Sequence, residues 1–123
     1  MTPFGDRMRK LRSERGITLK EMAEALGVSS AYLSALEHGK RGRPGWHLIQ
    51  RILAYFTIIW DEADEVVRLA RISHPRITID TSGLDPKATE LANRLADEIG
   101  KIDATTLDDL LATLVRKRQR ARG

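Results

Sequence analysis

Residues 18–38, TLKEMAEALGVSSAYLSALEH, decide the fold of this chain. Thr18, followed three residues later by Glu21, is a capping box, which is the sequence signature of a helix start. Apolar residues then recur at helical spacing until Gly27, which can adopt the positive φ that ends a helix in a tight turn. Ser29 is a typical N-cap for the next helix. The stretch therefore predicts two short helices joined by a tight turn.

The spacing within this stretch matches a helix–turn–helix motif. Such a motif needs a small residue where its two helices approach and a flexible residue in its turn, and these are Ala23 and Gly27. Its interior positions must be apolar, and they are Met22, Leu26, Val28, Leu33 and Leu36. A generic helical hairpin would have apolar stripes without this combination of small residue, glycine and flanking caps. We therefore interpret residues 19–38 as a helix–turn–helix motif.

Charge is distributed unevenly along the 123 residues. Residues 1–60 hold ten lysines and arginines against five acidic residues, residues 61–115 hold six against twelve, and residues 116–123 hold five against none. A basic surface binds phosphate backbones through counterion release, whereas an acidic surface is repelled by them. The first sixty residues are thus expected to meet nucleic acid, and the acidic middle to face solvent or protein.

Residues 73–84 interrupt the helical pattern and are expected to link two parts of the chain. Pro75 disfavours helix, and the alternation of Ile77 and Ile79 with polar residues predicts a short strand. A lone strand needs a partner for its backbone groups, which a second chain can supply. On one side of this linker lie the motif and further predicted helices, within residues 1–72.

Two amphipathic helices are expected within residues 85–117, with a basic tail at 118–123. Their apolar stripes must be covered by each other, by the N-terminal part or by another subunit. Together with the predicted strand they are the candidates for dimerisation. The residues concerned are Ile77, Ile79, Leu91, Leu95, Ile99, Leu107, Leu110, Leu111 and Leu114.

The stretch LRSERGITLKEMAEALGVSSAYLSALEHGKRGRP, residues 11–44, resembles the DNA-binding domain of the phage repressor and Cro superfamily, the XRE type. The resemblance covers about residues 4–72 and implies an all-α fold, with a five-helix repressor-like domain. A short strand or linker and a C-terminal helical pair would follow it. The resemblance also implies sequence-specific binding of double-stranded DNA by a homodimeric transcriptional regulator in the cytoplasm.

Roles for individual residues follow from the same resemblance. Contacts to the phosphate backbone would come from Thr18, Lys20, His38, Lys40, Arg41 and Arg43. The recognition helix would present to the major groove the residues Ser29, Ser30, Ala31, Tyr32, Ser34 and Ala35. Arg12 and Glu37 match a pair that forms an internal salt bridge in many relatives, so Glu37 is expected to be structural.

The recognition helix departs from the family pattern at Ser30, Ala31 and Ala35. Many relatives carry Gln, Arg or Lys there, and each bidentate contact to a base discriminates by about 1–3 kcal/mol. Serine discriminates poorly, and alanine offers only a methyl contact to thymine. The tetrapeptide RGRP at residues 41–44 also matches the core of an AT-hook, an alternative to a basic loop on phosphates. We therefore expect affinity led by backbone contacts, with specificity from thymine contacts, DNA shape and dimer spacing.

Several other functions are not indicated by the sequence. The chain has no cysteine, and its three histidines lack the spacing of metal ligands. No apolar run approaches the roughly 20 residues of a membrane span, and the N-terminal residues do not read as a signal peptide. We expect no enzyme activity, cofactor, metal or membrane contact. Two alternatives stay open: an antitoxin-type regulator that binds a partner protein through residues 73–115, and a weakly specific architectural DNA-binding protein.

Overall fold

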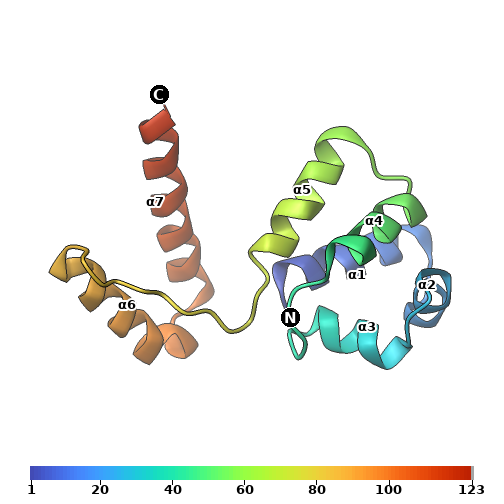
Figure 1. Cartoon of the computed structure of the whole chain (residues 1–123), viewed down its shortest axis with the longest axis horizontal. Helices are drawn as coiled ribbons and strands as arrows, with labels where there is room; N and C mark the ends of the chain where they lie inside the picture. Colours follow the sequence, from blue (N-terminus) through green and yellow to red (C-terminus); the bar gives the residue numbers. More distant parts are fainter. Residues whose placement is uncertain (123) are drawn as a thin grey trace. The chain divides into compact units, whose positions relative to one another are not determined.

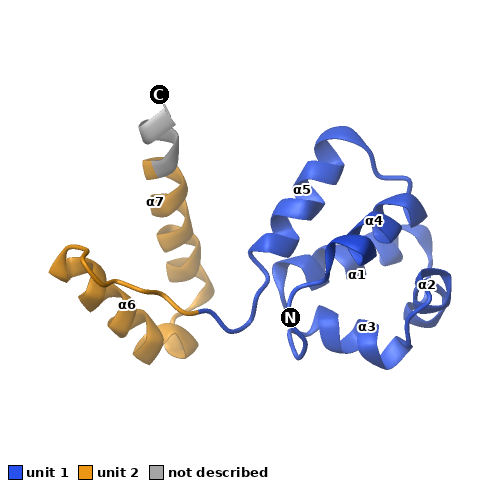
Figure 2. Ribbon diagram, in the orientation of Figure 1, with its two compact units in different colours: residues 1–77 blue, residues 78–123 orange. Residues whose placement is uncertain are grey.

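The computed structural model describes the backbone of residues 1–122 and the side chains of residues 1–117. The described chain is helical, which confirms the all-α prediction (Figure 1). Its elements are α1 (Pro3–Arg15), α2 (Leu19–Leu26), α3 (Ser30–Glu37), α4 (Trp46–Tyr55), α5 (Trp60–Arg71), α6 (Pro86–Glu98), the short 3-10 helix η1 (Ile99–Lys101) and α7 (Ala104–Arg122). They divide into two compact units, Met1–Ile77 and Thr78–Gly123, coloured separately in Figure 2.

Local signals in the sequence set the ends of α2 and α3. The backbone N–H of Glu21 donates to the hydroxyl of Thr18 at 3.0 Å, as the capping box predicts. Gly27 ends α2 with φ at 73°, and the next N–H, of Val28, donates back to the carbonyl of Ala23 at 3.0 Å. Ser29 then caps α3 by accepting from the N–H of Tyr32 at 3.0 Å. These bonds satisfy groups that helix ends otherwise leave free, so the turn is fixed locally.

The first unit has a single apolar core to which all five of its helices contribute. Helix α1 packs against α3 and α5, while α2 packs against α3 and α4. The interior positions expected from the motif are buried, except that Val28 is half-buried. The buried apolar residues are Phe4, Met8, Leu11, Met22, Ala23, Leu26, Leu33, Leu36, Leu48, Ile49, Ile52, Phe56, Ile58, Val66 and Ala70. This core holds α3 against its scaffold and leaves the first two residues of α3, Ser30 and Ala31, exposed.

The predicted strand at Ile77 and Ile79 is wrong for the described chain. Residues 72–85 form no strand, and the two isoleucines are 71% and 57% exposed. The physical reason is that the described chain offers no second extended segment to pair with their backbone groups. The first unit continues to Ile77, so the start of the expected linker belongs to this unit.

The second unit contains α6, η1 and α7, and its described side chains form no buried core. Asp85 caps α6 by accepting from the N–H of Lys87, and Asp103 accepts from the N–H of Thr106 at the start of α7, both at 2.8 Å. None of the side chains described from 78 to 117 is buried. Its exposed large apolar residues are Ile79, Leu84, Leu91, Ile99, Leu110, Leu111, Leu114 and Val115. No helix in the described part of the chain is both long and apolar enough to cross a membrane.

Candidate nucleic-acid interface

A tight turn connects α3 to the basic loop that follows it. Gly39 adopts a φ of 77°, and its N–H donates to the carbonyl of Leu36 at 3.4 Å. The N–H of Lys40 donates to the carbonyl of Ala35 at 2.8 Å, which completes a Schellman-type helix end. Beyond this turn Lys40, Arg41 and Arg43 are all exposed. The turn therefore ends α3 and presents a cluster of positive charge directly after it.

The structure separates the expected DNA-contacting residues into two groups. The exposed group contains Thr18, Lys20, Ser29, Ser30, Ala31, His38, Lys40, Arg41 and Arg43. The half-buried group contains Tyr32, Ser34 and Ala35. On α3 itself, the freely exposed edge is thus limited to Ser30, Ala31 and the helix ends. Of the basic tail, Arg116 and Lys117 are exposed, while Arg118, Arg120 and Arg122 lie outside the described side chains.

Hydrogen bonds within the domain already engage several polar groups of this surface. The hydroxyls of Thr18 and Ser29 accept from backbone N–H groups as helix caps. Nδ1 of His38 donates to the carbonyl of Ser34 at 2.8 Å, so Nε2 is the ring nitrogen left for a further hydrogen bond.

No group of three or more potential metal-ligating side chains lies together among the side chains described.

Tyr32 and Arg41 are brought together by the fold although the sequence separates them. The Tyr32 ring packs partly against the core, so it is not free to enter a groove as a whole. The guanidinium carbon of Arg41 lies 5.8 Å from the centre of that ring, within the range of a cation–π contact. The Arg41 side chain thus reaches back from the basic loop to a residue near the start of α3.

Arg12 and Glu37 form an ion pair between α1 and the end of α3. Arg12 Nη2 lies 2.7 Å from Glu37 Oε1, and the Glu37 side chain is only 2% exposed. Glu37 Oε2 has no hydrogen-bond partner among the described residues. Burial raises the pKa of Glu37 above its ordinary value, while the charges of Arg12, Arg9 and His38 act in the opposite direction. Glu37 therefore faces inward and orients the helix.

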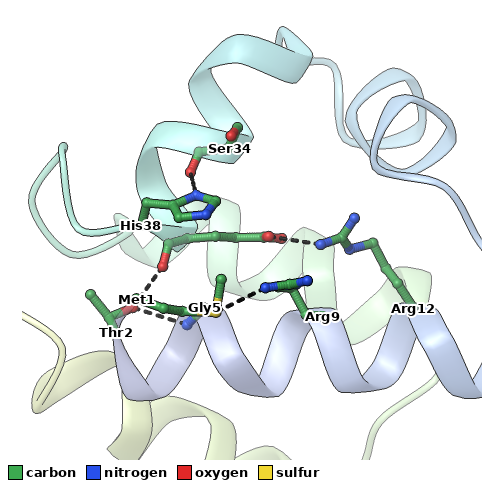
Figure 3. A network of polar contacts seen from close by, with 8 residues as sticks. Met1, Thr2, Gly5, Arg9, Arg12, Ser34 and His38 are labelled. Carbon is green, nitrogen blue, oxygen red and sulfur yellow. Dashed lines mark hydrogen bonds and ion pairs between the residues drawn. The ribbon is translucent and has the colours of Figure 1, made fainter.

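The backbone of Glu37 is held as firmly as its carboxylate. The N–H of Thr2 donates to the Glu37 carbonyl at 3.1 Å. A Cβ on Gly5 would collide with that same carbonyl, so only glycine lets α1 approach α3 this closely. Figure 3 shows Thr2, Gly5 and Arg12 facing the end of α3 that carries His38. Sequence reasoning missed Gly5, although a glycine inside a predicted helix is a signal of close backbone approach.

Two further residues support the motif from distant positions. Arg51 of α4 donates from Nη1 to the carbonyl of Leu26 at 2.8 Å, at the last turn of α2. Ser73, after α5, accepts from the N–H of Phe4 at 2.8 Å in the first turn of α1. Neither residue stands out in the sequence, because its partner lies 25 positions away in the first case and 69 in the second.

This arrangement defines a helix–turn–helix DNA-binding fold. A family model described as a helix-turn-helix domain matches residues 3–58. Residues 3–58 of the first unit therefore match a helix–turn–helix domain, which agrees with the resemblance stated from the sequence.

Particular relatives match the same region. The chain is 38% identical over 61 residues to the HTH-type transcriptional regulator RghRB of Bacillus subtilis (strain 168), a match covering 50% of this chain and 44% of that protein. It is 48% identical over 44 residues to the HTH-type transcriptional repressor RghR of the same strain, covering 36% and 33%. The chain thus spans less than half the length of these two relatives. A chain of the solved SinR protein/SinI protein complex aligns with 94% of this chain and 98% of its own length, at 22% identity and a TM-score of 0.44.

Proposed function

We propose that this protein is a sequence-specific double-stranded-DNA-binding transcription regulator that places α3 in the major groove. The observation that carries the proposal is the exposed edge of α3 next to a basic loop, in a domain of helix–turn–helix type. A helix presented in this way fits the major groove, and cations beside it fit the flanking phosphates. The protein would act by binding DNA in the cytoplasm rather than by catalysis.

Phosphate contacts would supply most of the affinity. Lys20, Lys40 and Arg43 are exposed and have no ion-pair partner among the described residues, so their charges are available to phosphates. The base-reading edge would consist of Ser30 and Ala31, while His38 would lie along the phosphate backbone. Because Ser and Ala discriminate weakly between bases, thymine contacts, DNA shape and half-site spacing would provide much of the specificity.

We further propose that the second unit makes the protein a homodimer. Two amphipathic helices with no buried residue leave apolar area exposed, which a second copy would cover. A symmetric pair would bring two recognition helices to successive major grooves, roughly 34 Å apart. Replacing Leu111 and Leu114 together by serine should then give monomers in analytical ultracentrifugation, whereas Ile59→Ser, at an exposed position of the first unit, should not. A monomeric wild-type chain would contradict this proposal and favour a different partner protein at this face.

The DNA-binding proposal is tested by selecting bound fragments from random duplex DNA and sequencing them. An enriched, two-fold symmetric motif is the expected result. Failure to enrich any motif, with equal affinity for all duplexes at matched salt, would favour the weakly specific architectural alternative.

Single substitutions then test whether the basic loop and the start of α3 contact DNA. Lys40→Ala and Arg43→Ala should weaken binding to every duplex and reduce the slope of log K against log salt concentration by about 0.9 for each phosphate that is no longer neutralised. Ser30→Ala should change base preference at one position of the motif. Lys87→Ala, which removes the same charge from the second unit, is the matched control and should leave the slope unchanged. If Lys40→Ala and Arg43→Ala behave like this control, the assigned face is wrong.

A further inference from the structure

The ends of two helices meet at Ser73. Its hydroxyl accepts from the N–H of Phe4 at 2.8 Å and donates to the carbonyl of Leu69 at 2.5 Å. Phe4 lies in the first turn of α1 and Leu69 in the last turn of α5, where backbone groups have no partner within their own helix. Ser73 is only 4% exposed, so water does not readily replace it. One side chain thus fixes the start of α1 to the end of α5.

The start of α1 in turn holds the end of the recognition helix. Thr2 caps α1 by accepting from the N–H of Gly5 at 3.0 Å, and its own N–H donates to the carbonyl of Glu37 at 3.1 Å. Glu37 is the last residue of α3, so this carbonyl also lacks a partner within its helix. Ser73 is therefore connected to the recognition helix through the N-terminal turn of α1.

A second contact reaches the recognition helix from the same side. A Cβ built on Gly39, in the turn after α3, would lie 3.4 Å from Pro75 and 3.1 Å from Thr2. The chain that leaves α5 thus packs beside the turn that orients the basic loop. An open hollow of about 290 Å³ borders these contacts, and its lining includes Thr2, Gly39, Ser73 and Pro75 but no buried apolar core residue. These contacts therefore lie at the edge of the first unit, outside its apolar core.

Taking DNA binding as proposed above, we infer that Ser73 and Pro75 form a latch that positions the recognition helix for DNA. With the latch closed, the end of α3 and its basic loop are already ordered before DNA arrives. With the latch open, that order must be restored on binding, which lowers affinity.

The test uses the full chain and three variants. Ser73→Ala removes the hydroxyl that joins the two helix ends. Pro75→Gly changes an exposed residue, removes its packing against the Gly39 turn and also frees the backbone at this position. Ile58→Val removes one methylene group from the core at the turn between α4 and α5, and it controls for a simple loss of stability. Affinity for the selected DNA motif and hydrogen exchange at the Thr2 amide are measured for each.

Ser73→Ala should weaken binding to the selected motif about five- to tenfold and speed exchange of the Thr2 amide, because the buried N–H of Phe4 loses its acceptor. Pro75→Gly should change both readouts in the same direction by a smaller factor. Ile58→Val should change neither once the folded fraction is accounted for.

Equal affinity and equal Thr2 exchange in Ser73→Ala, Pro75→Gly and wild type would overturn the latch. If Ser73→Ala does not fold, Pro75→Gly decides by the same two readouts. If the wild type binds no duplex DNA, the proposed function fails, whereas Thr2 exchange still decides whether Ser73 controls the end of α3.

Discussion

Arg12 joins α1 to the recognition helix by pairing with Glu37 across 2.7 Å, and both side chains are largely withdrawn from water, at 12% and 2% exposure. A buried ion pair loses hydration that its mutual attraction does not always recover. Consistent with this, burial is the largest influence on Glu37 and raises the pKa of its carboxyl. The pair therefore orients α3 without being a large source of stability, and its two members should respond differently to substitution.

The raised pKa predicts how stability depends on pH. Because folded Glu37 holds its proton more tightly than in the unfolded chain, its contribution to stability is full below its ordinary value of 4.5 and is lost as pH rises through the raised pKa. Glu37→Gln has no proton to lose, so this part of the pH dependence should vanish in chemical denaturation curves. At neutral pH the variant should be about as stable as wild type, or more stable. A wild-type curve that gains stability over this pH range relative to Glu37→Gln would contradict the assignment.

Removing the arginine should be far more damaging than removing the glutamate. Arg12→Met keeps most of the stem but leaves a buried carboxylate without its partner, and breaking a buried pair in this way costs about 3–5 kcal/mol of unfolding free energy. The double variant with Glu37→Gln should recover most of that loss, because no unpaired charge remains. Urea denaturation of the two single variants and the double variant measures this coupling. Simple additivity of the two single effects would show that the residues do not act as a pair.

Gly5→Ala should be strongly destabilising although alanine is the better helix former. The intrinsic helix preference alone would favour alanine by about 1 kcal/mol. The new Cβ would instead collide with the backbone carbonyl of Glu37, which is rigidly held, and overpacking of this kind costs about 1–3 kcal/mol or more. Gly42→Ala is the control, since a Cβ there meets nothing within 4 Å and its φ is not positive. Equal midpoints for the two variants in thermal unfolding would refute the close approach of α1 and α3.

Tyr32 should influence DNA binding through Arg41. Tyr32→Leu removes the aromatic face but keeps apolar bulk toward the core, and a cation–π interaction at an exposed site is worth about 0.5–1 kcal/mol. DNA affinity should fall about two- to fivefold as Arg41 becomes less ordered, whereas Tyr32→Phe should bind normally because the ring remains. In the Arg41→Ala background, Tyr32→Leu should have no further effect. An unchanged effect of Tyr32→Leu in that background would mean that the tyrosine acts on DNA independently.

The motif itself was predictable because its signals are local. The hydroxyls of Thr18 and Ser29 accept hydrogen bonds from the backbone N–H groups of Glu21 and Tyr32. Gly27 can adopt the positive φ of the turn without help from any other residue. Each of these groups meets its partner within a few residues, so short-range geometry and the apolar period determine the two helices before any tertiary contact forms. The same reasoning predicted further helices within residues 1–72 and two helices within residues 85–117.

Only the tertiary structure decided how the motif is held and which of its residues are free. The Ser73 hydroxyl accepts a hydrogen bond from the N–H of Phe4, and the N–H of Thr2 donates to the carbonyl of Glu37. The partners in each bond are too far apart in the sequence for a local pattern to predict them. The strand expected around Ile77 did not form because backbone pairing needs a second segment that the described chain does not supply. Tyr32, expected on the DNA face, is half-buried because the packing of the core side chains sets the rotation of α3. The residues at which a helix starts and ends depend on its neighbours along the chain. The orientation of each helix depends on which apolar faces and which backbone groups without a partner in their own helix come together in the folded protein.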